Sequence, residues 1–179
     1  MALTATIYNL TIDLADIDRG VYENLEVCIA RQPSETVEYM FMRLIAYCLE
    51  YSDGIVLTQG VAAGNEPAVL IRDLTGRVTA WIEVGMPDPE RLNRGLKLAG
   101  RAAVYTHRDV QKVLAQLSAA GVDRLSAVPV YEFDRSFVDE IAALIERRST
   151  LSISVTEREL YLEIRGRTFS ATIAEHHAE

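Results

Sequence analysis

Residues 78–89 read Val78-Thr79-Ala80-Trp81-Ile82-Glu83-Val84-Gly85-Met86-Pro87-Asp88-Pro89, and this stretch decides the fold of the 179-residue sequence. Its first seven residues are mostly β-branched, aromatic or small apolar types, which predicts a strand. Asp88 and Pro89 then predict the start of a helix, with Asp88 as its N-cap and Pro89 in its first turn. The stretch therefore predicts a strand that leads directly into a helix.

The segments around this stretch extend it to a helix, three strands, a helix and a strand between residues 34 and 106. Ser34 is expected to cap the first helix, with Glu35 in its first turn and apolar residues at helical spacing as far as Tyr51. The other expected elements are strands at 55–59, 68–72 and 78–84, a helix from 88 to about 99, and a strand at 102–106.

Outside this region the sequence predicts an added N-terminal strand pair and a C-terminal β-meander. It contains no repeat, low-complexity segment or linker, which favours one mixed α/β domain over residues 1–179. The expected elements here are strands at 3–14 and 23–30, helices at 108–120 and 134–147, a strand at 127–133, and meander strands at 151–155, 160–164 and 168–173.

The composition is that of a globular protein, with 49% hydrophobic and 25% charged residues and a formal net charge of −8. This charge argues against a broadly basic nucleic-acid binder. No apolar stretch is long enough to span a membrane, and the amino terminus has no cationic lead-in for export. Cys28 and Cys48 stand alone, which is typical of a reducing compartment, so we expect a cytoplasmic protein with no membrane partner.

Sequence motifs exclude several kinds of chemistry. No phosphate-binding glycine loop or Gly-x-Ser-x-Gly elbow is present, so nucleotide-driven chemistry and serine hydrolysis have no support. Of the three histidines, His107 is expected inside the fold, whereas His176 and His177 are expected in a frayed, solvated terminus. A zinc centre built on histidines is therefore not favoured.

Two carboxylates indicate a different chemistry, the binding of a divalent metal ion. Asp73 ends one expected strand and Glu83 lies within the next, so we expect the two side chains to approach one another and a single cation. Their hard oxygen atoms suit Mg²⁺ or Mn²⁺. The alternative for Glu83 is a solvated glutamate at a strand end. Glu38, at the flank of the first helix's apolar stripe, points toward the strand ends or, alternatively, pairs with an arginine at the surface.

Basic side chains lie on the helix that is expected after Glu83. Arg94, Lys97 and Arg101 form one stripe along it, and Arg94 or Lys97 is expected to approach the carboxylates if this face turns inward. The alternative is a solvated helix face. Residues 61–112 carry eight basic and six acidic side chains, a local charge of +2, which leaves room for a short basic rim that contacts nucleic acid.

Several blocks of residues also match a known pattern from end to end. They are Met1-Ala2-Leu3-x-Ala5-Thr6-Ile7-Tyr8, Asp16-x-Asp18-Arg19, Ala30-Arg31-x-Pro33-Ser34-Glu35-Thr36-x-Glu38 with Arg43-Leu44, Glu66-Pro67, Asp73, Trp81-Ile82-Glu83-x-Gly85-x-Pro87-Asp88, and Thr106. With these blocks the sequence resembles the YaeQ family of bacterial proteins. The resemblance implies a restriction-endonuclease-like core of the PD-(D/E)XK class, with Asp73 and Glu83 as metal ligands and Glu38 as an auxiliary glutamate.

One position departs from the class pattern. Gly85 stands where the class has a lysine two residues after the acidic position, so Arg94 or Lys97 would have to stabilise the phosphate instead. Three hypotheses follow. The chain is a Mg²⁺- or Mn²⁺-dependent phosphodiesterase, a non-catalytic module that binds protein or nucleic acid with a degenerate nuclease site, or an acidic scaffold whose meander edge at 151–173 pairs with another chain.

Overall fold

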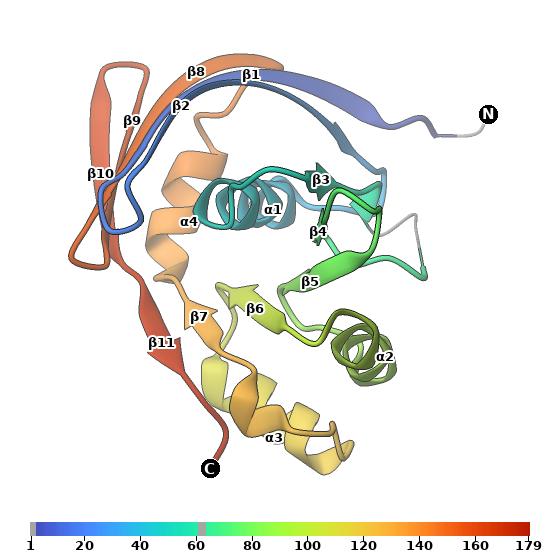
Figure 1. The fold of residues 1–179 in the computed structure, drawn as a ribbon. Helices are drawn as coiled ribbons and strands as arrows, with labels where there is room; N and C mark the ends of the chain where they lie inside the picture. The colour runs from blue at the N-terminus through green and yellow to red at the C-terminus, as the bar shows by residue number, and fades with distance from the viewer. Residues whose placement is uncertain (1–2, 61–63) are drawn as a thin grey trace. The chain divides into compact units, whose positions relative to one another are not determined.

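A computed structural model describes residues 3–60 and 64–179 and shows a mixed α/β protein with two sheets (Figure 1). The chain forms two compact units, each built on one sheet. The first unit combines the chain up to Phe41 with Phe133–Ile173, and the second combines Met42–Glu132 with Ala174–Glu179. Both units are discontinuous in sequence, so no linker marks the division, and the single domain over residues 1–179 stays a prediction.

The first unit contains a five-stranded sheet in the order β10-β9-β8-β1-β2. β1 pairs with β2 in an antiparallel hairpin and with β8 in parallel, which joins the N-terminal strand pair to the C-terminal meander. The strand pair and the meander were predicted, whereas their junction was not. The elements are β1 (Thr6–Asp16), β2 (Val21–Arg31), α4 (Arg135–Ala142), β8 (Arg148–Thr156), β9 (Glu159–Ile164) and β10 (Arg167–Thr172).

Buried and exposed side chains alternate along these strands, so the sheet has one buried face and one exposed face. In β1, Leu10, Ile12 and Leu14 are buried and the residues between them are not, as the period of two requires. Beside the sheet, the ring of Phe137 in α4 lies 6.2 Å from the ring of Phe41 and 6.5 Å from that of Phe133. Only one face of this sheet therefore contributes to the core of the unit.

The second unit contains a six-stranded sheet in the order β11-β7-β6-β5-β4-β3. β3, β4 and β5 are antiparallel, and β5, β6 and β7 are parallel. The chain order α1, β3, β4, β5, α2, β6 matches the predicted helix, three strands, helix and strand. The elements are α1 (Val37–Leu49), which begins in the first unit, β3 (Ile55–Leu57), β4 (Val69–Arg72), β5 (Val78–Val84), α2 (Pro89–Ala99), β6 (Ala102–Thr106), α3 (Val110–Ala119), β7 (Val130–Glu132) and β11 (Ala174–His176).

Helix α2 forms as its sequence predicts. The Asp88 side chain accepts hydrogen bonds from the backbone N–H groups of Glu90 and Arg91, and Gly100 ends the helix in a left-handed conformation. Its buried residues, Leu92, Gly95, Leu96 and Ala99, pack against β5 and β6. Gly95 touches the sheet so closely that an added Cβ would lie 2.1 Å from the Trp81 ring.

Several other helices and strands begin or end at residues that differ from those predicted. The first helix begins at Val37, because the Thr36 hydroxyl accepts a hydrogen bond from the Tyr39 N–H and acts as the cap in place of Ser34. Glu35 lies before the helix and is buried. α4 ends at Ala142, and the expected strand at 127–133 shortens to β7 behind a 3-10 turn at Leu125–Ala127. No helix among the described residues is long and apolar enough to cross a membrane.

The predicted frayed C-terminus is wrong. β11 pairs antiparallel with β7, which places His176 opposite Val130. His177 has its Nε2 atom 2.7 Å from Glu175 Oε1 and its Nδ1 atom 3.0 Å from the Ser126 carbonyl oxygen. Both neighbours are acceptors, so protonated histidine, with two N–H donors, satisfies both of them. The partners lie in distant sequence, which explains why local composition missed this strand.

These contacts make His177 sensitive to pH. The hydrogen bond to Glu175, and then the one to Ser126, raise the pKa of His177. Because the folded-state pKa is raised, the contribution to stability is complete below about pH 6.5 and is lost as the pH rises through the folded-state value. Replacing His177 by alanine is expected to lower the free energy of unfolding by a few tenths of a kcal/mol at pH 5.5 and to leave it unchanged at pH 8.5. Urea unfolding at the two pH values checks this, and an equal loss at both would contradict it.

Candidate functional site

Glu83 is held in the interior of the second unit by two neighbouring side chains. It is fully buried on β5, so the structure excludes the solvated alternative. Arg91 donates from Nε to Oε1 and from Nη2 to Oε2, each at 2.8 Å. The indole N–H of Trp81 donates to Oε1 at 2.9 Å. Both carboxylate oxygens are therefore engaged, and the buried charge is paired.

The local sequence explains why Arg91 is the partner. β5 leads directly into α2, so the first turn of the helix returns beside the end of the strand where Glu83 lies. Arg91 lies four residues before Gly95, on the helix face that packs against the sheet. The buried stripe at 92, 95, 96 and 99 could have indicated this face. Depth along the helix alone favours Arg94 as the partner of Glu83. It does not show in which direction the side chain points.

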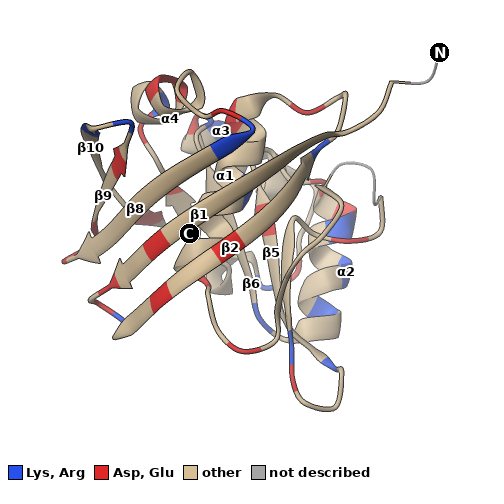
Figure 2. Cartoon of the chain, turned by 90° about the horizontal axis from the view of Figure 1, so that it is seen from above, with Lys and Arg blue, Asp and Glu red and all other residues tan. Residues whose placement is uncertain are grey.

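The predicted basic rim, Arg94, Lys97 and Arg101, has other partners. Arg94 donates to the Asn65 side chain at 3.3 Å, and Lys97 pairs with Asp123 at 2.9 Å. The hydrogen bond from Lys97 lowers the pKa of Asp123. The basic residues of α2 are coloured in Figure 2. Among the described residues these three cations pair with Asn65, Asp123 and Glu50, so the structure does not bring Arg94 or Lys97 together with Glu83.

Asp73 lies at the turn between β4 and β5. Its Oδ1 atom accepts hydrogen bonds from the Thr75 hydroxyl at 2.6 Å and from the backbone N–H groups of Thr75 and Arg77 at 2.9 and 3.1 Å. These bonds, the one from the Thr75 hydroxyl above all, lower the pKa of Asp73. The carboxylate is exposed and stabilises the turn.

The structure does not bring Asp73 and Glu83 together. β4 and β5 are antiparallel, with Arg72 opposite Val78 and Val69 opposite Ile82. The end of β4 therefore meets the start of β5, whereas Glu83 lies near the end of β5. Glu83 lies six positions after Arg77, about 20 Å of extended chain at roughly 3.3 Å per residue. The expectation that these two strands end near one another assumed a shared direction that the hairpin does not have.

Glu38 occupies the first turn of α1 and is half-buried. It belongs to the first unit, whereas Asp73 and Glu83 belong to the second. Among residues 3–60 and 64–179, no group of three or more histidine, cysteine, aspartate or glutamate side chains could hold a metal ion. Asp73 and Glu83 therefore form no shared site in this arrangement, and the Mg²⁺ or Mn²⁺ ion stays a prediction.

A second buried carboxylate was missed by the sequence reasoning. Glu50, just after α1, accepts hydrogen bonds from Arg101 Nη2 at 2.6 Å and from the Tyr105 hydroxyl at 2.7 Å. Burial, followed by the charge of Glu50, raises the pKa of Tyr105 well above its usual value, so this phenol stays a neutral donor. Glu50 lies 51 and 55 positions before Arg101 and Tyr105, so no local motif could have found the cluster.

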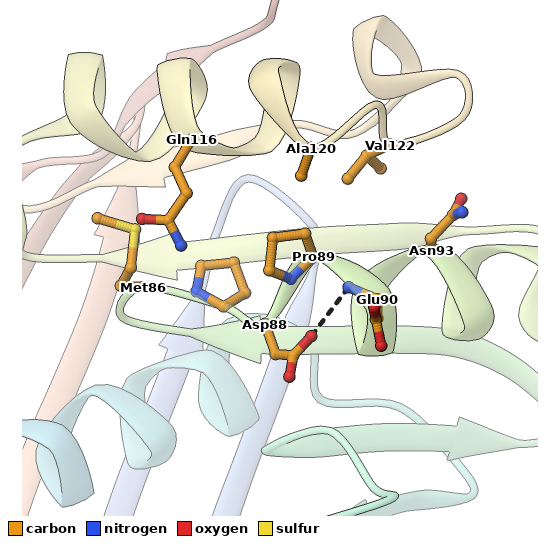
Figure 3. Close-up of a pocket in the computed structure, with 9 residues that line it drawn as sticks. Met86, Asp88, Pro89, Glu90, Asn93, Gln116, Ala120 and Val122 are labelled. Carbon is orange, nitrogen blue, oxygen red and sulfur yellow. Dashed lines mark hydrogen bonds between the residues drawn. The ribbon is translucent and has the colours of Figure 1, made fainter.

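A cavity of about 610 Å³ lies between the start of α2 and the end of α3 (Figure 3). Gln116 and Ala120 face Met86 and Pro89 across it, while the Asp88 carboxylate turns toward the N–H of Glu90. Neither Asp73 nor Glu83 lines this cavity. Its polar groups are amides and carboxylates, with no nucleophile beside a base among them.

Comparison with known proteins assigns the family. The family described as YaeQ protein matches residues 1–173. The chain belongs to the YaeQ family. Two relatives share the description "Uncharacterized protein YaeQ": that of Escherichia coli (strain K12) is 30% identical over 164 residues, and that of Salmonella typhi is 27% identical over 163 residues. Each match covers 90% of both chains.

Two solved structures share the YaeQ fold. The crystal structure of the YaeQ protein from Xanthomonas axonopodis pv. citri matches with a TM-score of 0.87 and 27% identity, over 98% of this chain and 100% of that chain. The crystal structure of the YaeQ protein from Pseudomonas syringae matches with a TM-score of 0.89 and 27% identity, over 98% of this chain and 97% of that chain. The mixed α/β architecture of this chain is therefore that of the YaeQ family.

Proposed function

We propose that this YaeQ-family chain is a non-catalytic binding module with a degenerate nuclease site, and that its partner is a protein. The observation that carries the proposal is the state of Glu83, whose two oxygens accept hydrogen bonds from Arg91 and Trp81. A cation at this carboxylate would have to displace a bidentate arginine in a buried position. Breaking such a pair is costly because it leaves a charge without a partner.

Two further observations support the loss of a metal site. Asp73 stabilises the β4–β5 turn at the opposite end of the hairpin from Glu83. Gly85 occupies the position at which the class pattern has its lysine. A carboxylate pair with no shared cation and no general base cannot activate water for attack on a phosphate.

The charge distribution favours a protein over nucleic acid as the partner. The chain carries a net charge of −8, and two cations of the basic rim, Lys97 and Arg101, already pair with Asp123 and Glu50. Affinity for nucleic acid depends on cations that can neutralise phosphates. A cytoplasmic location is part of the same proposal, because Cys28 and Cys48 form no disulfide.

Calorimetric titration with MnCl₂ tests the proposal. We expect no saturable heat with a Kd below about 1 mM, because no described carboxylate cluster can offer a cation three ligands. The matched variants are Glu83→Gln, which removes the buried carboxylate, and Glu90→Gln, which removes an exposed one nearby. Binding of one Mn²⁺ per chain that is lost in Glu83→Gln and kept in Glu90→Gln would overturn the proposal.

The second candidate function is a Mg²⁺- or Mn²⁺-dependent phosphodiesterase of the PD-(D/E)XK class that acts on nucleic acid. The element order α1, β3, β4, β5, α2, β6 and the buried glutamate on the third strand favour it. This hypothesis requires a rearrangement of the described site, so that Asp73 and Glu83 together hold the metal, Glu38 supports them, and Arg94 or Lys97 stabilises the phosphate. Incubation of labelled DNA and RNA with the protein and MnCl₂ tests it, and the reading requires cleavage that Glu83→Gln abolishes.

A further inference from the structure

The five-stranded sheet of the first unit has an exposed face, which we call the open face. It carries small hydroxyl-bearing residues and a few charged ones. It consists of the outward-pointing side chains of β1, β2, β8, β9 and β10, which alternate with buried apolar ones. Figure 2 looks onto this sheet and shows acidic positions on β1 and β2 among mostly uncharged residues. A sheet face this regular offers hydrogen-bonding groups in fixed rows.

One row of the open face places two carboxylates on either side of a serine. Asp13 on β1 lies opposite Ser152 on β8, Ser152 lies opposite Glu163 on β9, and Glu163 lies opposite Thr168 on β10. Neighbouring strands are about 4.8 Å apart, so the backbones at Asp13 and Glu163 are separated by roughly 10 Å. Both side chains are exposed on the same face as Ser152.

A cavity of about 270 Å³ lies on this row and the next. Ser152, Ser154 and Ala15 are small, which leaves a hollow between the larger side chains around it. Asp13, Glu163 and Tyr161 line it, and Tyr161 is 45% exposed. The hollow is therefore bordered by two negative charges and one aromatic ring.

The two carboxylates of this cavity have no partner within the described ranges 3–60 and 64–179. Neither the Asp13 nor the Glu163 side chain makes a hydrogen bond or an ion pair there. Glu26 and Glu159, which also lie on the sheet, accept hydrogen bonds from the hydroxyls of Thr11 and Thr172. The acceptor capacity of Asp13 and Glu163 is thus available to a group from outside the chain.

We propose that this cavity receives an arginine side chain from a partner protein. A guanidinium group carries N–H donors on opposite edges of a plane, so it can bridge carboxylates on two sides. Its flat face can also stack on the ring of Tyr161. An ammonium group has the charge without this geometry. Nucleic acid is disfavoured here, because the two carboxylates repel phosphate. The inference rests on the protein-binding part of the proposed function and names its recognition surface.

Amide NMR titration of the full chain with Nα-acetyl-arginine methylamide tests the proposal. We expect saturable, millimolar binding, with shifts centred on Ser152, Ser154, Tyr161 and Glu163. The double variant Asp13→Asn with Glu163→Gln should bind about tenfold more weakly, because both ionic contacts are lost. The matched double variant Glu26→Gln with Glu159→Gln has the same change of charge outside the cavity, and should bind as the unchanged protein does.

Three other probes separate the outcomes. Nα-acetyl-citrulline methylamide has nearly the same shape without charge and should leave the cavity unshifted. Equal binding of the corresponding lysine probe would overturn the choice of arginine, and equal shifts with a single-stranded DNA oligonucleotide would overturn the choice of protein. Self-association in sedimentation that the Asp13 and Glu163 variants abolish would make the occupant a second copy, also against the proposal. Because Mn²⁺ binding is not involved, failure here leaves the non-catalytic assignment standing.

Discussion

Replacing Arg91 by methionine is expected to lower the free energy of unfolding by about 3 kcal/mol or more. Methionine fills much of the same space, but it donates no hydrogen bond to either oxygen of the fully buried Glu83. Trp81 Nε1 remains as the only one of the three donors described above for this carboxylate. The reason for the size of the effect is that a buried ion without its partner keeps its desolvation cost and loses the attraction that offsets it. Urea unfolding followed by circular dichroism measures the change.

Two variants serve as controls for the Arg91 result. Arg94→Met makes the same change on the same helix. Within residues 3–60 and 64–179 its guanidinium has the exposed Asn65 amide as its only hydrogen-bond partner, so a loss below about 0.5 kcal/mol is expected. Combining Arg91→Met with Glu83→Gln removes both charges and should recover most of the loss. If Arg91→Met and Arg94→Met prove equally stable, the buried ion pair is not what holds α2 on β5.

Replacing Gly95 by alanine is the second change with a large expected effect, a loss of about 2 kcal/mol or more. Alanine favours a helix over glycine by about 1 kcal/mol, so an exposed site would gain stability. At this site the new Cβ would lie 2.1 to 2.3 Å from three atoms of the Trp81 indole, so α2 or the ring must move. Overpacking of a close contact of this kind outweighs the gain in helix propensity.

Trp81 makes the Gly95 variant easy to follow, because it is the single tryptophan of the sequence and is 4% exposed. Its fluorescence should shift to longer wavelength in Gly95→Ala as the ring is displaced toward water. Trp81→Leu alone loses the indole hydrogen bond to Glu83, but it makes room for the methyl group, so it should cost less stability in Gly95→Ala than in the unchanged protein. A variant more stable than the unchanged protein, with unshifted emission, would show that the contact between α2 and β5 is looser than described.

Local signals predicted the parts of the fold that depend on neighbouring residues. Asp88 and Pro89 determine where α2 begins, because the cap and the fixed φ of proline act within one turn. The expected strand at residues 78–84 is β5, since its side chains suit a sheet buried on both faces. The first helix was placed two residues too early, because Ser34 and Thr36 are both competent caps and composition does not choose between them.

Contacts between distant residues account for most of what the sequence could not predict. The separation of Asp73 from Glu83 depends on the antiparallel pairing of β4 with β5, which composition does not encode. The Glu50 cluster joins positions about fifty residues apart. Arg91 is the exception, because the apolar stripe of α2 carried enough information to find it. The roles of Glu38, Asp73, Glu83, Arg94 and Lys97 in catalysis stay predictions.

The parallel pairing of β1 with β8 has a consequence for how the chain acquires its structure during synthesis. Thr11 lies opposite Thr150, which is 139 positions later. At roughly 5–20 residues per second, about 7 to 28 s pass between the emergence of these two strands from the ribosome. One edge of the β1–β2 hairpin stays open during that interval and is able to pair with other chains. Completion of the first sheet is thus a late event, because it cannot precede the emergence of β8.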